Sequence, residues 1–80
     1  MKDNNFHPNR VCTVYDSSNV LSIAYDFVNY TLRIQFKSGL YDYSPILPAI
    51  FGKFVSSDSV GSAVNDWLKS DSPKFRKVSL

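Results

Sequence analysis

The residues best suited to binding chemistry in this chain are aromatic rings interleaved with positive charges. Six Phe, five Tyr and one Trp are spread among nine Lys and Arg residues. Proteins use aromatic planes to stack nucleobases and cations to neutralise phosphates. The sequence therefore favours binding of a nucleotide or RNA, and its candidate ligand-binding residues are Ser18, Asn19, Arg33, Lys37, Tyr41, Tyr43 and Trp67.

Catalytic and metal-binding residue sets are much harder to find. Acid-base catalysis needs two titratable groups in different environments, and nucleophilic catalysis needs a nucleophile, a base and an orienting group. His7 stands alone in a polar N-terminal stretch, and the lone Cys12 lies in a predicted strand with no base nearby. We therefore expect a non-enzymatic protein with no cofactor and no metal.

Composition sets further limits on the partners. A net charge of +2 is compatible with nucleic-acid binding without requiring it. Eighty residues make one domain with a small core, so a homo-oligomer is expected. The single cysteine fits a reducing compartment, and no signal-like run or stretch of ~20 apolar residues is present, so we expect a cytoplasmic protein with no membrane partner.

Three segments predict an antiparallel meander. Apolar and polar residues alternate from Thr31 to Lys37, which is typical of a strand with one buried face. Val20 to Tyr25 precedes it across an Asp-initiated turn, and Tyr41 to Ser44 follows a Ser-Gly turn. Val11 to Tyr15 is rich in β-branched and aromatic residues and predicts an additional N-terminal edge strand.

Two helices are predicted after the meander. Pro48 is suited to the first helical position, and the apolar residues from Ile50 to Val55 form one stripe. Asp58 or Ser59 can cap a second helix whose apolar residues recur at helical spacing as Val60, Ala63, Val64, Trp67 and Leu68. The expected fold is α+β, in the order β-β-β-α-α with both helices on one sheet face, and it divides into a flexible arm (1–10), a domain (11–70) and a basic C-terminal tail (71–80).

Strand register decides what the two central tyrosines do. If Ser38-Gly39 is the hairpin loop, Tyr41 opposes Phe36 and Tyr43 opposes Ile34, so both rings join the apolar face. A slip of one residue would place them on the open face beside the cations of the preceding strand. Alternation favours the first register, which places a ligand in a pocket at the sheet edge or between subunits.

The remaining candidate binding residues could have a structural role instead of a binding role. Ser18 and Asn19 belong to a polar break that is typical of a turn, although such a cluster could also hold a phosphate or ribose. Trp67 could lock its helix to the sheet or anchor a partner, and packing at the edge of the core is favoured.

The strand and helix order resembles the KTSC domain, a module named for its place at the C-terminus of some lysyl-transfer-RNA synthetases and also found as a small bacterial or phage protein. The matching residues are Ser17-Ser18-Asn19, Ile23-Ala24-Tyr25-Asp26, Leu32-Arg33-Ile34-Gln35-Phe36, Ser38-Gly39, Tyr41-Asp42-Tyr43, Leu47-Pro48, Ser59-Val60-Gly61 and Asn65. The resemblance implies the β-β-β-α-α fold, and RNA binding has been proposed for the family by analogy. Ser62, Ala63 and Val64 stand where the family usually has aromatic residues, so contacts made by those aromatics do not carry over.

These observations lead to two functional hypotheses. The first is a binding module for a nucleotide or RNA, with a variant in which a phage-type homo-oligomer sequesters a nucleotide second messenger at sites where protomers meet. The alternative is a protein-interaction adaptor that docks on a host or phage protein, without nucleotide, through the polar sheet face or Trp67.

Overall fold

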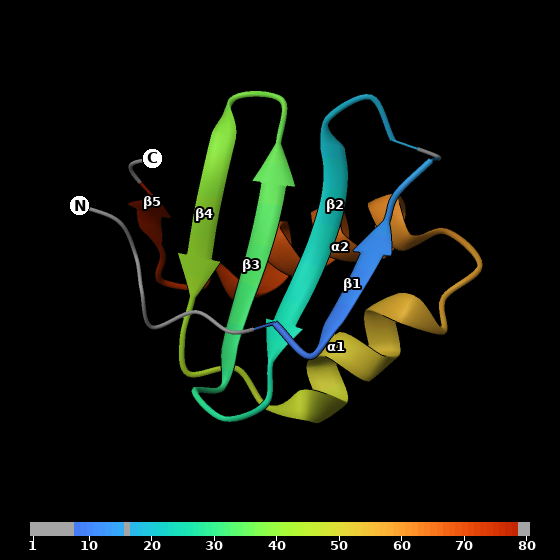
Figure 1. Cartoon of the computed structure of the whole chain (residues 1–80). Coiled ribbons are helices and arrows are strands. Elements are labelled where there is room, and N and C mark those ends of the chain that lie inside the picture. The colour runs from blue at the N-terminus through green and yellow to red at the C-terminus, as the bar shows by residue number, and fades with distance from the viewer. Residues whose placement is uncertain (1–7, 16, 79–80) are drawn as a thin grey trace.

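Five antiparallel strands form one sheet, and both helices cover one of its faces (Figure 1). The computed structural model describes residues 8–15 and 17–78, so residues 1–7 of the expected arm lie outside the described residues. The strands follow the order β1-β2-β3-β4-β5 across the sheet. In chain order the elements are β1 (Arg10–Thr13), β2 (Val20–Asp26), β3 (Thr31–Phe36), β4 (Gly39–Tyr43), α1 (Pro48–Val55), α2 (Val60–Asp71) and β5 (Arg76–Val78).

The predicted α+β class, the meander β2-β3-β4, the N-terminal edge strand β1 and the two helices are all present. The prediction of a three-stranded meander with one added edge strand is incomplete, because β5 forms a second edge. Residues expected to form a solvated basic tail instead pair with β4, with Arg76 opposite Asp42 and Val78 opposite Leu40. β5 forms because it pairs with β4, which is far away in the sequence. The local sequence pattern therefore does not predict this strand.

Side chains close the turns on either side of β2. The Ser17 hydroxyl accepts hydrogen bonds from the backbone N–H groups of Asn19 (3.1 Å) and Val20 (3.0 Å), which confirms the predicted turn. Asp26 is fully buried and accepts from the N–H groups of Val28 (2.9 Å) and Asn29 (3.1 Å). Tyr30 is the left-handed residue of that turn (φ 52°). Its sequence predicts Asn29 instead, because Asn tolerates this conformation better than Tyr does.

The β3–β4 hairpin turns one residue earlier than predicted. Its loop is Lys37-Ser38, and Gly39 is the first residue of β4, paired with Phe36. Gly39 has φ 147°, a conformation that other residues rarely adopt. The glycine is therefore needed inside the strand end and not in the loop.

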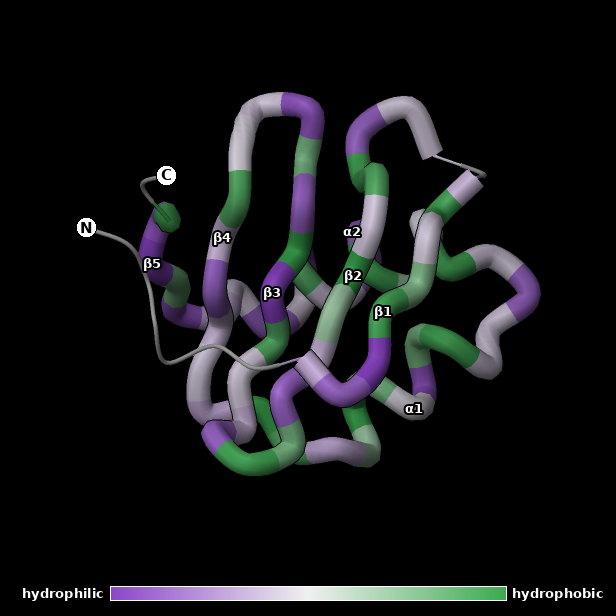
Figure 2. Tube along the Cα trace, viewed as in Figure 1, coloured by the Kyte–Doolittle hydropathy of each residue, from purple (hydrophilic) through white to green (hydrophobic). Residues whose placement is uncertain are grey.

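Both central tyrosines lie on the apolar face, as the alternation predicted. The predicted partners are wrong, however: Tyr41 pairs with Ile34 and Tyr43 with Leu32, a shift of two residues that keeps the face unchanged. Figure 2 shows the alternation of hydrophobic and hydrophilic residues along β3 that specifies this face. The shift also places Asp42 directly opposite Arg33.

A β-bulge changes the buried set at the start of β2. The pairing with β3 shifts between Val20 and Ser22, so one residue is left without a cross-strand partner. Val20 is consequently buried, whereas Leu21 is 38% exposed. Simple alternation predicts that Leu21, Ile23 and Tyr25 share one apolar face, which is wrong for Leu21 because of the bulge.

The helices begin and end as their sequences predict. Pro48 is the first residue of α1, where its missing N–H costs nothing. Ser59 caps α2 and its hydroxyl accepts from the N–H of Ser62 at 3.3 Å. Ser72 ends α2 in a left-handed conformation (φ 44°), and Pro73 prevents its continuation.

The core lies between the sheet and the helices and includes two buried phenols. Tyr25 stacks on Phe51 of α1 (ring centroids 5.4 Å apart), and its hydroxyl donates to the carbonyl of Ile46. Burial raises the pKa of Tyr25 above its usual 10.0, and the nearby charges of Tyr30 and Asp26 add to the shift. Burial likewise raises the pKa of Tyr43, with a further contribution from Tyr41.

The sheet face away from the two helices, which we call the uncovered face, carries an ion-pair network that joins β3, β4 and β5. Arg33 donates two hydrogen bonds to the Asp42 carboxylate, from Nε at 2.7 Å and from a terminal nitrogen at 2.9 Å. Arg76 donates to the same carboxylate at 3.1 Å. The Asp42 side chain is 5% exposed and Arg33 16%, whereas Arg76 is 64% exposed. Asp42 and Arg33 therefore form a desolvated pair, and Arg76 closes the network from the rim.

Replacing Asp42 with alanine should lower the free energy of unfolding by about 3–5 kcal/mol, because the largely buried Arg33 then loses its carboxylate. The matched variant Arg76→Ala removes only an exposed member of the network and should cost about 1 kcal/mol or less. Urea denaturation measures both changes. Equal decreases in the free energy of unfolding for the two variants would contradict the assignment of Arg33 and Asp42 as the main stabilising pair.

The two buried phenols predict a loss of stability in alkali. A raised pKa means that the folded state holds the phenol proton more tightly than the unfolded chain does. The free energy of unfolding should therefore be insensitive to these groups below pH 10.0 and fall as pH rises above that value. Denaturation at a series of pH values should show a shallower fall for Tyr43→Phe than for the wild-type chain, and identical slopes would contradict the assignment.

Candidate functional site

A small cleft opens beside β4 and β5. It has a volume of about 200 Å³ and is lined by Asn19, Phe36, Ser38, Tyr41, Tyr43 and Phe75. These residues come from the turn before β2, the end of β3, the hairpin loop, β4 and the segment that leads into β5. We call this the β4–β5 cleft. Five separate parts of the chain build it, and β5 must pair with β4 for Phe75 to be in place.

Tyr41 is the central ring of the β4–β5 cleft. Phe36 contacts it edge-on from one side (ring centroids 5.5 Å apart) and Phe75 from the other (5.3 Å). Phe75 also lies 6.1 Å from the Tyr43 ring, yet it is 61% exposed. An aromatic side chain this exposed but held against two further rings offers a positioned stacking surface.

A lysine lies over this aromatic group. The Lys77 ammonium nitrogen is 5.8 Å from the centroid of the Tyr41 ring, within the range of a cation–π contact. The Lys77 side chain also crosses the backbone of Gly39, where an added Cβ would meet Cε at 3.3 Å. Gly39 therefore serves the hairpin conformation and leaves room for the lysine over Tyr41.

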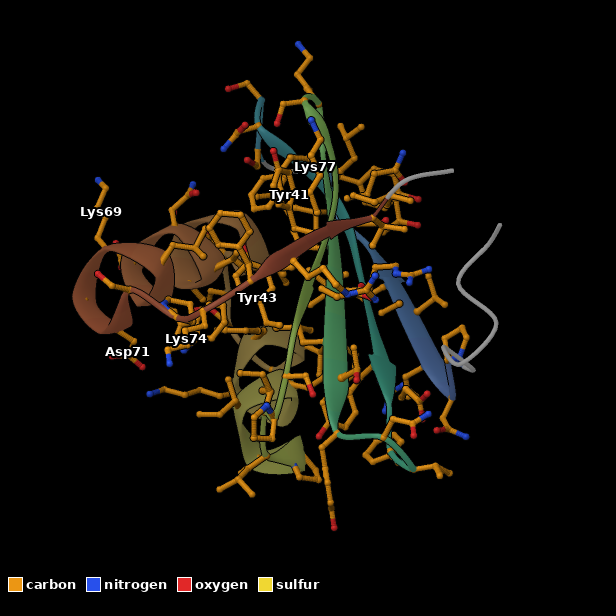
Figure 3. All side chains as sticks on the ribbon, turned by 90° about the vertical axis from the view of Figure 1, so that its left-hand side faces the viewer. Tyr41, Tyr43, Lys69, Asp71, Lys74 and Lys77 are labelled. Carbon is orange, nitrogen blue, oxygen red and sulfur yellow. The ribbon has the colours of Figure 1, made fainter. Side chains whose placement is uncertain are left out.

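Further positive charge lies on the same side of the molecule. Figure 3 views the β5 edge directly, and Lys69 of α2, Lys74 of the connection and Lys77 of β5 all lie on this side with Tyr41 and Tyr43. Lys74 and Lys77 are exposed. Lys77 is the cation that contacts a ring of the cleft, whereas Lys69 and Lys74 lie toward α2 on the same side, together with Asp71.

The inner wall of the cleft continues into the core. Tyr43 contacts Trp67 of α2 edge-on (5.3 Å), and Trp67 contacts Phe54 of α1 in the same way (5.3 Å). Burial raises the pKa of Tyr43 above its usual 10.0, and its phenol is a potential hydrogen-bond donor. The rings of the cleft are thus supported by both helices.

The structure brings together only part of the predicted site. Asn19, Tyr41 and Tyr43 line the β4–β5 cleft. Ser18 and Lys37 are exposed in the two turns above it, and these turns are joined because the Lys37 N–H donates to the Asn19 carbonyl at 3.0 Å.

Arg33 and Trp67 do not line this cleft. Arg33 lies on the opposite face of the sheet, where it pairs with Asp42, so its predicted place in the ligand site is not supported by its position. Trp67 packs beneath Tyr43 and lines a separate groove between the helices. The favoured prediction of packing at the edge of the core fits its two ring contacts.

The sequence reasoning missed four residues of the cleft region: Phe36, Ser38, Phe75 and Lys77. Phe75 is an aromatic residue inside a basic run, and this pattern is the sequence signal that could have identified it as a binding residue. Lys77 could not be placed without knowing that β5 pairs with β4, opposite Tyr41.

The size of the cleft limits what it can hold. A volume of about 200 Å³ is below the ~300–1,000 Å³ of sites for drug-sized ligands. It therefore suits one planar ring, with the rest of a ligand lying outside on the surface beside the lysines. Within residues 8–15 and 17–78, no three His, Cys, Asp or Glu side chains gather as metal ligands, and no helix is long and apolar enough to cross a membrane.

Comparison with known proteins places the chain in a family. The model of the KTSC domain matches residues 16–71. A crystal structure of a KTSC domain protein from Yersinia pestis is similar, with a TM-score of 0.71 and 30% sequence identity, and the match covers 88% of this chain and 100% of that one. No curated protein matches the sequence. The sequence match extends over most of the chain and the structural match includes the whole relative, so this protein belongs to the KTSC domain family.

Proposed function

We propose that this protein is a non-enzymatic binding module for a nucleotide or single-stranded RNA, with one base held in the β4–β5 cleft. The observation that carries this proposal is an exposed aromatic ring, Phe75, fixed 5.3 Å from Tyr41 while the Lys77 ammonium lies over the same tyrosine. A base inserted beside these rings gains stacking, and its phosphate lies near the ammonium.

The polar residues of the cleft fit the same ligand. Asn19 offers an amide and Ser38 a hydroxyl at the rim, and both can bond the edge of a base or a ribose hydroxyl. The opposite face of the sheet is less suited to a nucleotide, because Arg33 is committed to Asp42. Cys12 lies on β1, at the other edge of the sheet from the cleft, and its thiol donates to the Thr13 carbonyl at 3.7 Å.

Ligand size distinguishes the two forms of the proposal. A cleft for one ring would bind the terminal or single base of a mononucleotide, a cyclic nucleotide or an ADP-ribose derivative, as a protein that sequesters a second messenger requires. An RNA strand would use the same cleft and add phosphate contacts on Lys69 and Lys74. RNA affinity should consequently fall more steeply with salt than mononucleotide affinity.

Removing the exposed ring should weaken binding. Phe75→Ala should cost about 1–3 kcal/mol of binding free energy, the usual contribution of one stacked base. Isothermal titration with nucleotides and short RNA oligomers measures the loss. Tyr15→Ala is the matched control, because Tyr15 is 91% exposed and belongs to neither the cleft nor the core. Equal affinities for Phe75→Ala and wild type would overturn the assignment of the cleft.

The lysine over Tyr41 predicts a change in salt dependence. Lys77→Ala should lower RNA affinity and reduce the slope of log K against log salt by about 0.7, the value for one phosphate contact on a single strand. Lys53→Ala, an exposed lysine of α1, is the control and should leave the slope unchanged. An equal change of the salt slope in both variants would contradict the prediction that Lys77 contacts a phosphate of the bound RNA.

A further inference from the structure

A second, larger concavity lies between the two helices. This groove, which we call the helix groove, has a volume of about 580 Å³ and is lined by Ile50, Lys53, Phe54, Ser57, Asp58, Ser59, Ser62, Ala63, Asp66, Trp67, Ser70 and Asp71. Its apolar surface comes from Ile50, Phe54, Ala63 and Trp67. The volume falls within the range of sites that hold a ligand or a short segment of a partner. The proposed base cleft shares none of these residues.

The rim of the helix groove is acidic. Asp58, Asp66 and Asp71 line it against a single cation, Lys53. Asp58 precedes the N-cap of α2, Asp66 lies in the second half of the helix and Asp71 is its last residue, so the carboxylates are spread along the groove and are not gathered at one point. Serine and alanine at the other positions of this face leave room for a close approach. The groove therefore suits an extended cationic segment with an apolar side chain, and its charge disfavours nucleic acid.

The same chain presents such a segment on its surface. Lys74, Phe75, Arg76 and Lys77 are consecutive and exposed, with Phe75 at 61% and Arg76 at 64%. The segment lies on the side that faces the viewer in Figure 3, and its strand β5 is the edge strand at the left of the sheet in Figure 1. Its own groove is out of reach, because the pairing of Arg76 with Asp42 and of Lys77 with Tyr41 holds it on β4. Only the groove of another molecule can receive it.

We propose that the helix groove of one copy receives the Lys74–Lys77 segment of a second copy. The charges are complementary, since the carboxylates of the rim meet Lys74 and Lys77 while Arg76 stays paired with Asp42 of its own chain, and the exposed ring of Phe75 meets an apolar surface that includes Trp67. The groove and the segment are different surfaces, so the contact is heterologous and joins molecules head to tail. A domain of 80 residues with a small core gains stability from such association.

The segment includes Phe75 and Lys77 of the proposed base cleft, so the contact is tested by charge reversal on either surface in nucleotide-free protein, where it forms whether or not the cleft binds a base. Sedimentation velocity should show that the wild-type chain associates with rising concentration and dissociates as NaCl is raised to about 1 M, where the screening length is about 3 Å. Asp66→Lys and Lys74→Asp alter exposed side chains, and each should weaken self-association by about tenfold or more through repulsion between like charges. Gln35→Lys, on the uncovered sheet face, adds positive charge elsewhere and should associate as the wild type does.

Mixing the two variants gives the sharpest outcome. Asp66→Lys retains an intact segment and Lys74→Asp retains an intact groove, so an equimolar mixture should associate with the two variants in a one-to-one ratio although neither variant associates alone. A wild-type chain that stays monomeric at about 1 mM in low salt overturns the proposal. So does an oligomer that survives both reversals, because its interface must then lie elsewhere. Circular dichroism confirms that the variants are folded.

Discussion

The carboxylate of Asp42 is the point on which the arrangement of this protein depends. It lies on β4 with Arg33 of β3 on one side and Arg76 of β5 on the other, and it accepts hydrogen bonds from both. A buried carboxylate needs such partners, since burying it alone would cost several kcal/mol. The requirement fixes the register of β3 against β4 and selects β5 as the next strand. One buried charge is thereby paired across three strands, of which β5 is far from β3 and β4 in the sequence.

The cleft is a consequence of that alignment on the other face of the sheet. Once Arg76 is opposite Asp42, the next residue, Lys77, must be opposite Tyr41 and point to the apolar face. The preceding residue, Phe75, then reaches Tyr41 and Tyr43. Ion pairing on one face thus positions an aromatic ring and an ammonium group on the other. The charges on the first face are paired with one another, and the second carries the cleft that we propose as the binding site.

Local pattern was sufficient for the part of the fold in which neighbouring segments pair. The alternation of Leu32, Ile34 and Phe36 with polar residues predicts both the strand and its buried face, and the same parity places Tyr41 and Tyr43 correctly although their partners were shifted by two residues. Pro48 and Ser59 mark the helix starts because their effects are confined to one turn. These elements need no knowledge of distant contacts.

The remainder depends on interactions between distant residues. A three-residue strand rich in Arg and Lys looks like a solvated tail until Asp42 is known to face it, so β5 could not be predicted. Phe75 and Lys77 were missed with it. Arg33 was predicted to bind a ligand because a cation on a strand face resembles a phosphate site. The observed register, which brings Asp42 opposite Arg33, needs the turn at Lys37-Ser38 and the unusual backbone of Gly39 as well as the ion pair. The candidate site was therefore predicted only where it is built from β4 and the turn before β2.

The central claim is that a base lies against the rings of β4 and the segment before β5. Nuclear Overhauser contacts between the base protons of adenosine monophosphate or a short single-stranded RNA and the ring protons of the protein measure this directly. The account predicts contacts to Tyr41 and Phe75, with the largest amide shifts in β4 and β5. Contacts confined to the uncovered face around Arg33 and Gln35, or the absence of any contact with either ligand at millimolar concentration, would contradict it.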